Sequence, residues 1–176
     1  NEIKSNHAIY DENLKLLQSI GFTEITTTEK YVIIGDDIVF DELNGFITSD
    51  KKAIITDTDN NKVYLNNFKY FINNFIFKSI GKIKVEDNLK NTYNFSQVYI
   101  DTKKKELLGT DIKNFINKDD FKIDKRNKPR IFANTVKMNE EITTFSKSNF
   151  TLCNFREDDK CPPWSIQSTE MLHDSK

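Results

Sequence analysis

The side chains best suited to chemistry in this chain are two cysteines and two histidines. Cys153 and Cys161 lie eight residues apart, and the histidines are His7 and His173. A structural zinc site takes about four such ligands, and a nucleophilic cysteine needs a histidine that is oriented by a third group. Only His173, which Asp174 follows, could serve a cysteine in that way. We therefore expect no metal site, no cofactor and no catalytic residue, and the protein is not predicted to be an enzyme.

The segment around the cysteines has a local chemistry of its own. The pair could form a surface disulfide, remain two unreactive thiols, form an oxidised pair in a secreted or periplasmic protein, or await partners outside the fragment. Cys161 is followed by Pro162, Pro163 and Trp164. Two consecutive prolines impose an extended segment that lacks two backbone donors, so it cannot lie inside a sheet. Trp164 is then expected to anchor the departing chain on the core through its large apolar area.

Composition narrows the class of protein. The 176 residues fit one domain that is large enough to bury a core, and 26 basic against 27 acidic residues disfavour a nucleic-acid binder. With 37% hydrophobic residues and 14 phenylalanines the chain is too apolar for disorder. No apolar run approaches the roughly 18 residues of a membrane-spanning helix. Because the chain opens on Asn1 and ends on Lys176 within a pattern, we expect it to be a fragment of a longer protein.

The elements that would position any site follow a repeat of thirty residues. An aromatic or aliphatic residue precedes an aspartate at Tyr10-Asp11, Phe40-Asp41 and Ile100-Asp101, and Tyr70-Phe71 fills the remaining slot. Such self-similarity indicates stacked units that bury their apolar faces against one another. Further columns at the same interval are Ala8, Ile38, Phe68 and Val98; Ile25, Ile55, Val85 and Phe115; Ile33, Val63 and Tyr93; and Leu16, Phe46 and Ile76, a column that Glu106 breaks.

Within each unit, apolar alternation and turn residues indicate short strands. Residues 42–45 and 57–61, with their equivalents at 87–91 and 102–105, are rich in Asn, Asp and Gly, which favour tight reversals. The repeat weakens after Asn117, where a charged stretch resembles an insertion, and returns as echoes at residues 136–139 and 171–174. The sequence therefore predicts an all-β array of stacked antiparallel hairpins of about thirty residues, apolar on one face. Its terminal edge strands would invite pairing with another chain.

Several motifs resemble the LptD family of lipopolysaccharide-assembly proteins, also called the organic-solvent-tolerance or OstA-like family. The resemblance rests on Phe150-Thr151-Leu152-Cys153, on Cys161-Pro162-Pro163-Trp164-Ser165-Ile166, on His173-Asp174, and on repeats at residues 36–41 and 44–49. It covers most of the chain and is weakest over residues 117–147. It implies that residues 1–150 form an OstA-like β-jellyroll with an apolar groove. Residues 151–176 would then be a linker to an outer-membrane β-barrel outside the fragment.

The resemblance also implies a function. The domain would be a non-catalytic lipid conduit on the periplasmic side of the cell outer membrane. It would receive lipopolysaccharide from the periplasmic bridge protein LptA, by strand addition at its N-terminal edge, and pass it to its own C-terminal barrel with the plug lipoprotein LptE. The acyl chains of lipid A would be kept from water by groove residues drawn from the repeat columns: Tyr10, Ile25, Ile38, Phe40, Phe46, Ile55, Val63, Phe68, Tyr70, Ile76, Val85, Tyr93 and Val98.

For the C-terminal residues, the resemblance matches Cys153 with the family's cysteine at the end of the jellyroll. Cys153 would pair either with the barrel or with Cys161, and we expect the local disulfide in the fragment. The family's additional cysteine ahead of the jellyroll has no counterpart here. Pro162, Pro163 and Trp164 would form the interdomain anchor. Two alternatives remain open: the soluble bridge protein of the same fold, and a secreted β-sandwich with a closed core that binds protein or carbohydrate on its outer face.

Overall fold

The computed structural model describes residues 2–117, 128–139, 141–153 and 164–174, which form a single antiparallel sheet. Among the described residues there is no helix long and apolar enough to cross a membrane. The 16 strands are β1 (Glu2–Ser5), β2 (Ala8–Asp11), β3 (Leu16–Ser19), β4 (Phe22–Thr26), β5 (Val32–Asp36), β6 (Val39–Asp41), β7 (Phe46–Ser49), β8 (Ala53–Thr56), β9 (Lys62–Leu65), β10 (Phe68–Phe71), β11 (Ile76–Glu86), β12 (Thr92–Asp101), β13 (Glu106–Phe115), β14 (Arg130–Met138), β15 (Ile142–Thr151) and β16 (Ile166–Asp174).

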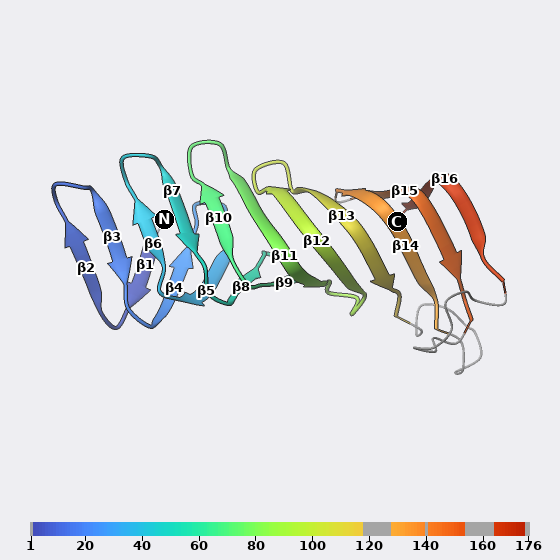
Figure 1. The fold of residues 1–176 in the computed structure, drawn as a ribbon, viewed down its shortest axis with the longest axis horizontal. Helices are drawn as coiled ribbons and strands as arrows, with labels where there is room; N and C mark the ends of the chain where they lie inside the picture. Colours follow the sequence, from blue (N-terminus) through green and yellow to red (C-terminus); the bar gives the residue numbers. More distant parts are fainter. Residues whose placement is uncertain (1, 118–127, 140, 154–163, 175–176) are drawn as a thin grey trace.

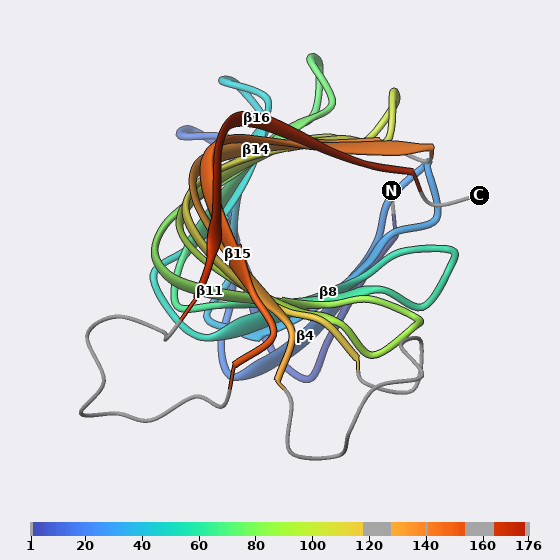
Figure 2. The ribbon, with the colours of Figure 1, turned by 90° about the vertical axis from the view of Figure 1, so that its right-hand side faces the viewer.

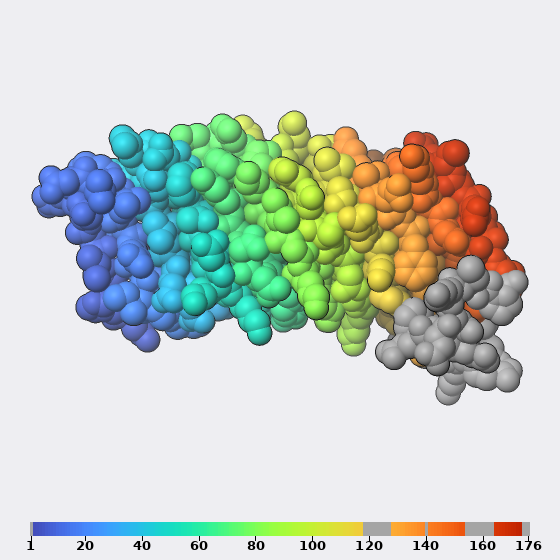
Figure 3. Space-filling view, in the orientation of Figure 1, coloured from blue at the N-terminus to red at the C-terminus, as the bar shows by residue number. Residues whose placement is uncertain are grey.

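The sheet folds over into two walls. In the N-terminal part the chain alternates between a first wall (β2, β3, β6, β7, β10) and a second wall (β1, β4, β5, β8, β9). The strands β11 to β16 are long enough to contribute to both walls, and β11 joins them by pairing with β10 at one end and with β9 at the other. The result is an elongated body that encloses an interior when viewed from its end (Figures 1 and 2). Colours follow the sequence along the long axis, so successive repeats stack from one end to the other (Figure 3).

Turns with a common geometry carry the repeat. The first-wall turns follow residues 11, 41, 71 and 101, and the second-wall turns span residues 27–31, 57–61 and 87–91. Carboxylates cap several of them: Asp11 accepts hydrogen bonds from the backbone N–H groups of Asn13 (2.9 Å) and Leu14 (3.0 Å). These turns need left-handed backbone conformations, which only Gly adopts without strain. Positive φ recurs at the thirty-residue interval at Lys15, Gly45, Phe75 and Lys105, and at Lys30, Asn60 and Lys90.

Strand register decides which side chains face the interior. Directly opposed residues in an antiparallel pair share a face of the sheet. On the first wall, Tyr70 lies opposite both Ile47 and Phe77, and all three are almost fully buried. On the second wall the inner column runs through Ile3, Ile25, Ile33, Ile55, Val63, Val85, Tyr93, Asn114, Ile131, Phe150 and Ile166. The hydrophobic core therefore lies between the walls, as the predicted stacking of apolar faces requires.

Two predicted groove residues, Phe46 and Ile76, face outward instead. Phe46 is opposite Asp41, and Ile76 is opposite Asp101. The reason is the length of the first-wall turns: Phe40 pairs across its turn with Ile47, seven residues later, so Phe46 falls on the other face. The prediction that Phe46 and Ile76 face the interior is wrong. The break of their column at Glu106 fits an outer face, where a carboxylate stays hydrated.

One column of the repeat shifts by one residue at β13. In β11 an additional residue is accommodated at the bend between Ile80 and Ile83, where Gly81 has a φ of 119°. Strand β12 has no counterpart of this additional residue. Because β12 and β13 pair in the same register on both sides of the bend, β13 has no counterpart either. Phe115, expected in the column of Ile25, Ile55 and Val85, pairs with Thr92 on the outer face. Asn114 takes its place inside.

The C-terminal third is more regular than the sequence indicated. Part of the predicted insertion, residues 118–127, lies outside the described residues, and regular strands β14 and β15 follow it. Strand β16 pairs with β15 along its length, from Phe150 opposite Ile166 to Thr143 opposite His173. The sheet therefore continues past residue 150 into the segment that the sequence assigned to a linker. At its ends, β1, β2 and β16 each pair with a single strand among the described residues.

Candidate functional site

A cavity of about 820 Å³ lies between the two walls and is mostly apolar inside. Its volume falls in the range of roughly 300–1,000 Å³ that is typical of small-molecule pockets. Both walls and the long strands contribute to the lining, so its shape depends on the stacking of several repeats. The apolar side chains that line it include Ile33, Ile55, Val63, Tyr70, Phe77, Val85, Tyr93, Ile100, Leu107, Ile131, Met138 and Phe145.

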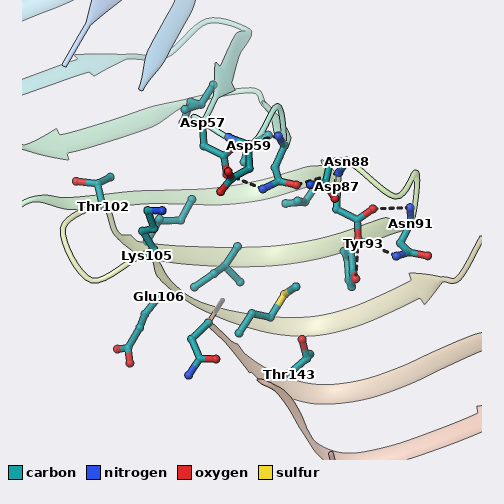
Figure 4. Close-up of a pocket in the computed structure, with 18 of the residues that line it drawn as sticks. Asp57, Asp59, Asp87, Asn88, Asn91, Tyr93, Thr102, Lys105, Glu106 and Thr143 are labelled. Atoms are coloured by element: carbon teal, nitrogen blue, oxygen red, sulfur yellow. Dashed lines mark hydrogen bonds between the residues drawn. The ribbon is translucent and has the colours of Figure 1, made fainter. Parts of the chain in front are cut away.

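The margin of the cavity is polar because it lies at the turns. The second-wall turns contribute Asp57, Asp59 and Asp87, and the β12–β13 turn contributes Lys105. Glu106, the outward-facing first residue of β13, lies at the rim beside Lys105. Figure 4 shows the aspartates along one margin and Lys105 with Glu106 along another. An apolar interior with a polar margin suits an amphiphile, whose chain leaves water while its head group stays hydrated. The described residues hold no group of three or more side chains that could bind a metal ion.

Hydrogen bonds fix the second-wall margin in place. Asp87 accepts from the backbone N–H of Asn91 (2.7 Å), from the Asn91 side chain (2.8 Å) and from the Tyr93 hydroxyl (3.1 Å). Burial, reinforced by the charge of Asp87, raises the pKa of Tyr93, so this phenol stays protonated as a donor. The amide oxygen of Asn61 accepts from the backbone N–H of Asn88 (2.9 Å) and thereby ties one turn to the next. The aspartates of this margin act first as turn caps.

A second set of contacts joins the two rows of turns. The hydroxyl of Tyr70 donates to Glu29 (3.2 Å), in the turn between β4 and β5, and lies 3.4 Å from the hydroxyl of Thr102 in a first-wall turn. Burial raises the pKa of Tyr70. Burial also acts to raise the pKa of Glu29, but hydrogen bonds from Thr28, its own backbone and Tyr70 outweigh it and lower this pKa. Tyr70, which lines the cavity, is thus held as a donor to the ionised carboxylate of Glu29.

The predicted groove residues divide into four groups in the structure. Cavity-lining positions are Ile55, Val63, Tyr70, Val85 and Tyr93. The buried core beside the cavity holds Ile25, Ile38, Phe68 and Val98. Phe40 and Tyr10 lie on the inner face by strand register but are not fully buried. Phe40 is half-buried, and Tyr10 is 44% exposed. The Tyr10 hydroxyl donates a hydrogen bond to Glu42 (2.9 Å). Phe46 and Ile76 lie outside.

The sequence interpretation missed cavity residues that a pairing rule would have found. Phe77 and Leu107 lie seven residues after Tyr70 and Ile100, directly opposite them across a first-wall turn. The first-wall turns follow the repeated residue pairs 10–11, 40–41, 70–71 and 100–101, which form the aromatic-plus-acid signature. Counting seven residues from the first member of each pair selects inner-face positions without use of the repeat columns. Asn114 was missed for a different reason, because the register shift at Gly81 displaces it from the column that the repeat defines.

The predicted anchor and disulfide lie only partly within the described residues. Cys161, Pro162 and Pro163 are outside them, so the pairing of Cys153 with Cys161 stays a prediction; Cys153 itself is a half-buried thiol. Trp164 is 46% exposed and does not bury the large apolar area expected of an anchor. Its backbone carbonyl instead accepts a hydrogen bond from the Thr151 hydroxyl (2.8 Å).

Comparisons with known proteins bear on the fold. No family model matches the sequence, and no curated protein matches it. Eight chains of solved structures do match, and one is LptH, the LptA-homologous periplasmic component of the lipopolysaccharide transport device of Pseudomonas aeruginosa. The TM-score is 0.54 at 20% sequence identity, covering 62% of this chain and 80% of that one. The likeness confirms the predicted fold class, an all-β antiparallel jellyroll without helices among the described residues.

Proposed function

We propose that this protein is a non-catalytic lipid conduit of the periplasm that carries lipopolysaccharide with its acyl chains between the two walls. The observation that carries the proposal is the inner face: one apolar surface, shared by successive repeats, that encloses a cavity of about 820 Å³. The fold shared with a periplasmic lipopolysaccharide transport component supports the choice of cargo.

The physical mechanism is passive. Each methylene moved out of water contributes roughly 0.8 kcal/mol, so an acyl chain is held without directional contacts and can slide between equivalent repeats. The stacked units offer similar side chains at successive positions along the axis, such as Ile55 and Val85. No bond is made or broken in this mechanism. Energy for directed movement must come from another component, since the sequence contains no phosphate-binding loop.

For the place of the chain in transport, we propose the periplasmic domain of an outer-membrane translocon of the LptD family. The C-terminal motifs at residues 150–153, 161–166 and 173–174 support this assignment. The partners would be LptA, added as a strand at the N-terminal edge where β1 and β2 each have one neighbour, together with the chain's own barrel and LptE. The second candidate is the soluble bridge protein, which the likeness to LptH favours.

A photo-crosslinking pair tests the conduit. A photoreactive residue at Tyr70, which lines the cavity, is expected to form lipopolysaccharide adducts in cells that make this lipid. The same residue at Lys69, on the opposite face of β10, and at Phe46 is expected to form none. Equal adducts at all three positions, or none at Tyr70, would contradict the conduit and favour the alternative, a closed-core β-sandwich that binds protein. Alkaline carbonate extraction separates the two candidates, because only the translocon chain stays with the outer membrane.

A further inference from the structure

Asn114 is an amide in an otherwise apolar position. It lies on the inner face of β13, opposite Tyr93 on one side and Ile131 on the other. The same column holds aliphatic side chains in the preceding repeats, among them Ile33, Ile55 and Val85. An amide is not needed to fill this column, since other strands fill the same position with Ile or Val. The polar group at this place therefore needs its own explanation.

The amide of Asn114 is buried and incompletely paired. The residue is 4% exposed, and its Oδ1 accepts no hydrogen bond from the part of the protein that the structure describes. Tyr93, the other polar member of the column, differs because its hydroxyl donates to Asp87 (3.1 Å). Buried polar atoms nearly always have a partner, because desolvation without one is unfavourable. Asn114 is also one of the residues that line the cavity. Its Oδ1 has almost no surface open to water, so a ligand would reach it only after the amide rotates about the Cβ–Cγ bond.

The position of Asn114 within the cavity indicates which part of a ligand it would meet. It lies near the end of β13, close to the second-wall margin: Asn117, three residues later, donates its backbone N–H to the Asn91 side chain in the margin (2.7 Å). Other lining positions on the inner face are apolar, such as Leu107 on the same strand and Ile131 directly opposite Asn114. A chain lying in the cavity would thus reach Asn114 where its apolar part ends and its polar part begins.

We propose that Asn114 is a ligand-recognition residue whose Oδ1 accepts a hydrogen bond from an amide N–H or hydroxyl at the head of an acyl chain in the cavity. The ligand class is an acylated amphiphile with a donor next to its chain, as opposed to a simple ester or hydrocarbon. The inference rests on the proposed function for the identity of the natural cargo, and it adds the donor that this cargo must carry. Geometry alone supports the site: one unpaired acceptor, one apolar column and one cavity.

Two probes that differ in a single group test the proposal. N-methyldodecanamide and methyl dodecanoate have the same shape, but only the amide carries an N–H donor. Their affinities are measured by displacement of a fluorescent lipid probe from the purified chain. A neutral hydrogen bond is worth a factor of about 2 to 10 in affinity. We expect the ratio of amide to ester affinity to fall by about that factor in Asn114→Leu, while the ester binds the variant at least as tightly.

A matched control separates the site from general effects. Asn94 lies on the outer face of the neighbouring strand β12, where its side chain donates to the Lys113 carbonyl (3.4 Å), and Asn94→Leu should leave the ratio unchanged. If Asn114→Leu fails to fold, Asn114→Val carries the same test. An unchanged ratio in a folded Asn114 variant, or failure of the wild type to bind either probe, overturns the proposal. A reduced ratio without lipopolysaccharide adducts at Tyr70 would leave the site standing and reject lipopolysaccharide as cargo.

Discussion

The inner and outer faces of the first wall both carry aromatic side chains, yet they use them differently. Inside, Phe68 and Phe77 stack with their ring centroids 5.3 Å apart and are almost fully buried. Outside, Phe46 and Phe71 meet edge to face at 6.4 Å, and Lys69 places its ammonium 3.5 Å from the Phe46 ring centroid. The inner rings exclude water by packing on other apolar groups, whereas the lysine stem and charge cover the outer ones. Residue type does not decide which face a ring occupies; the register across the turns does.

The largest expected effect contrasts a ring from each face. Phe77→Ala removes a side chain that is 1% exposed and leaves a cavity beside Phe68 and Tyr70, so the free energy of unfolding should fall by about 3–5 kcal/mol. Phe46→Ala removes a half-buried ring and its contact with Lys69, which should cost about 1 kcal/mol or less. Urea denaturation of both variants measures the difference. Similar losses would contradict the assignment of Phe46 to the outer face.

The fold was predictable because the chain repeats its signals. Four pairs recur at the thirty-residue interval, each beginning with an aromatic or aliphatic residue and three of them completed by an aspartate, and turn residues follow each pair. This regular interval specifies hairpins that stack in register. The structure adds a physical reason for the acid: the carboxylate of Asp101 caps the turn that follows it by accepting backbone hydrogen bonds. At the third copy Phe71 replaces the acid and the turn still forms, with Phe75 at positive φ. The signature therefore marks turns more than it marks a binding surface.

The site was less predictable than the fold for two reasons, one at the first-wall turns and one at the bend in β11. A periodic column says that residues are equivalent, but not which face they share, so Phe46 and Ile76 were assigned to the inside. Only the odd spacing across the turn, as between Phe40 and Ile47, fixes the face. The second reason is the single additional residue accommodated near Gly81, which exchanges Phe115 for Asn114 inside. A difference of one residue is small in a repeat of thirty, but it moves each later side chain of that strand segment to the opposite face of the sheet.

Gly109 offers a second comparison of the two faces, because side chains on the inner face must fit the space that the packed core leaves. A Cβ at Gly109 would overlap the Phe95 ring, so Gly109→Ala should lower the free energy of unfolding by about 1–3 kcal/mol. Leu108→Ala, at the adjacent 50%-exposed outer position, should cost about 0.5 kcal/mol. Adding Phe95→Leu to Gly109→Ala should recover part of the loss, because the smaller side chain vacates the space. A double-mutant cycle by urea denaturation that gives purely additive effects would show that the overlap is relieved elsewhere.

The smallest expected effect concerns the charges of the outer face. Hydrogen bonds from the backbone N–H groups of Lys104 (2.9 Å) and Lys103 (3.1 Å), with the nearby Lys104 ammonium, lower the pKa of Asp101. A carboxyl with a lowered pKa in the folded state stabilises the fold above its unfolded pKa of about 3.9, and this contribution is lost as the pH falls through the folded pKa. Asp101→Asn keeps the acceptor oxygen but removes the charge. The variant should be slightly less stable than the wild type near neutral pH, and the two should converge in acid. Urea midpoints at both pH values measure this, and a difference that persists in acid would mean that geometry, not charge, makes Asp101 useful.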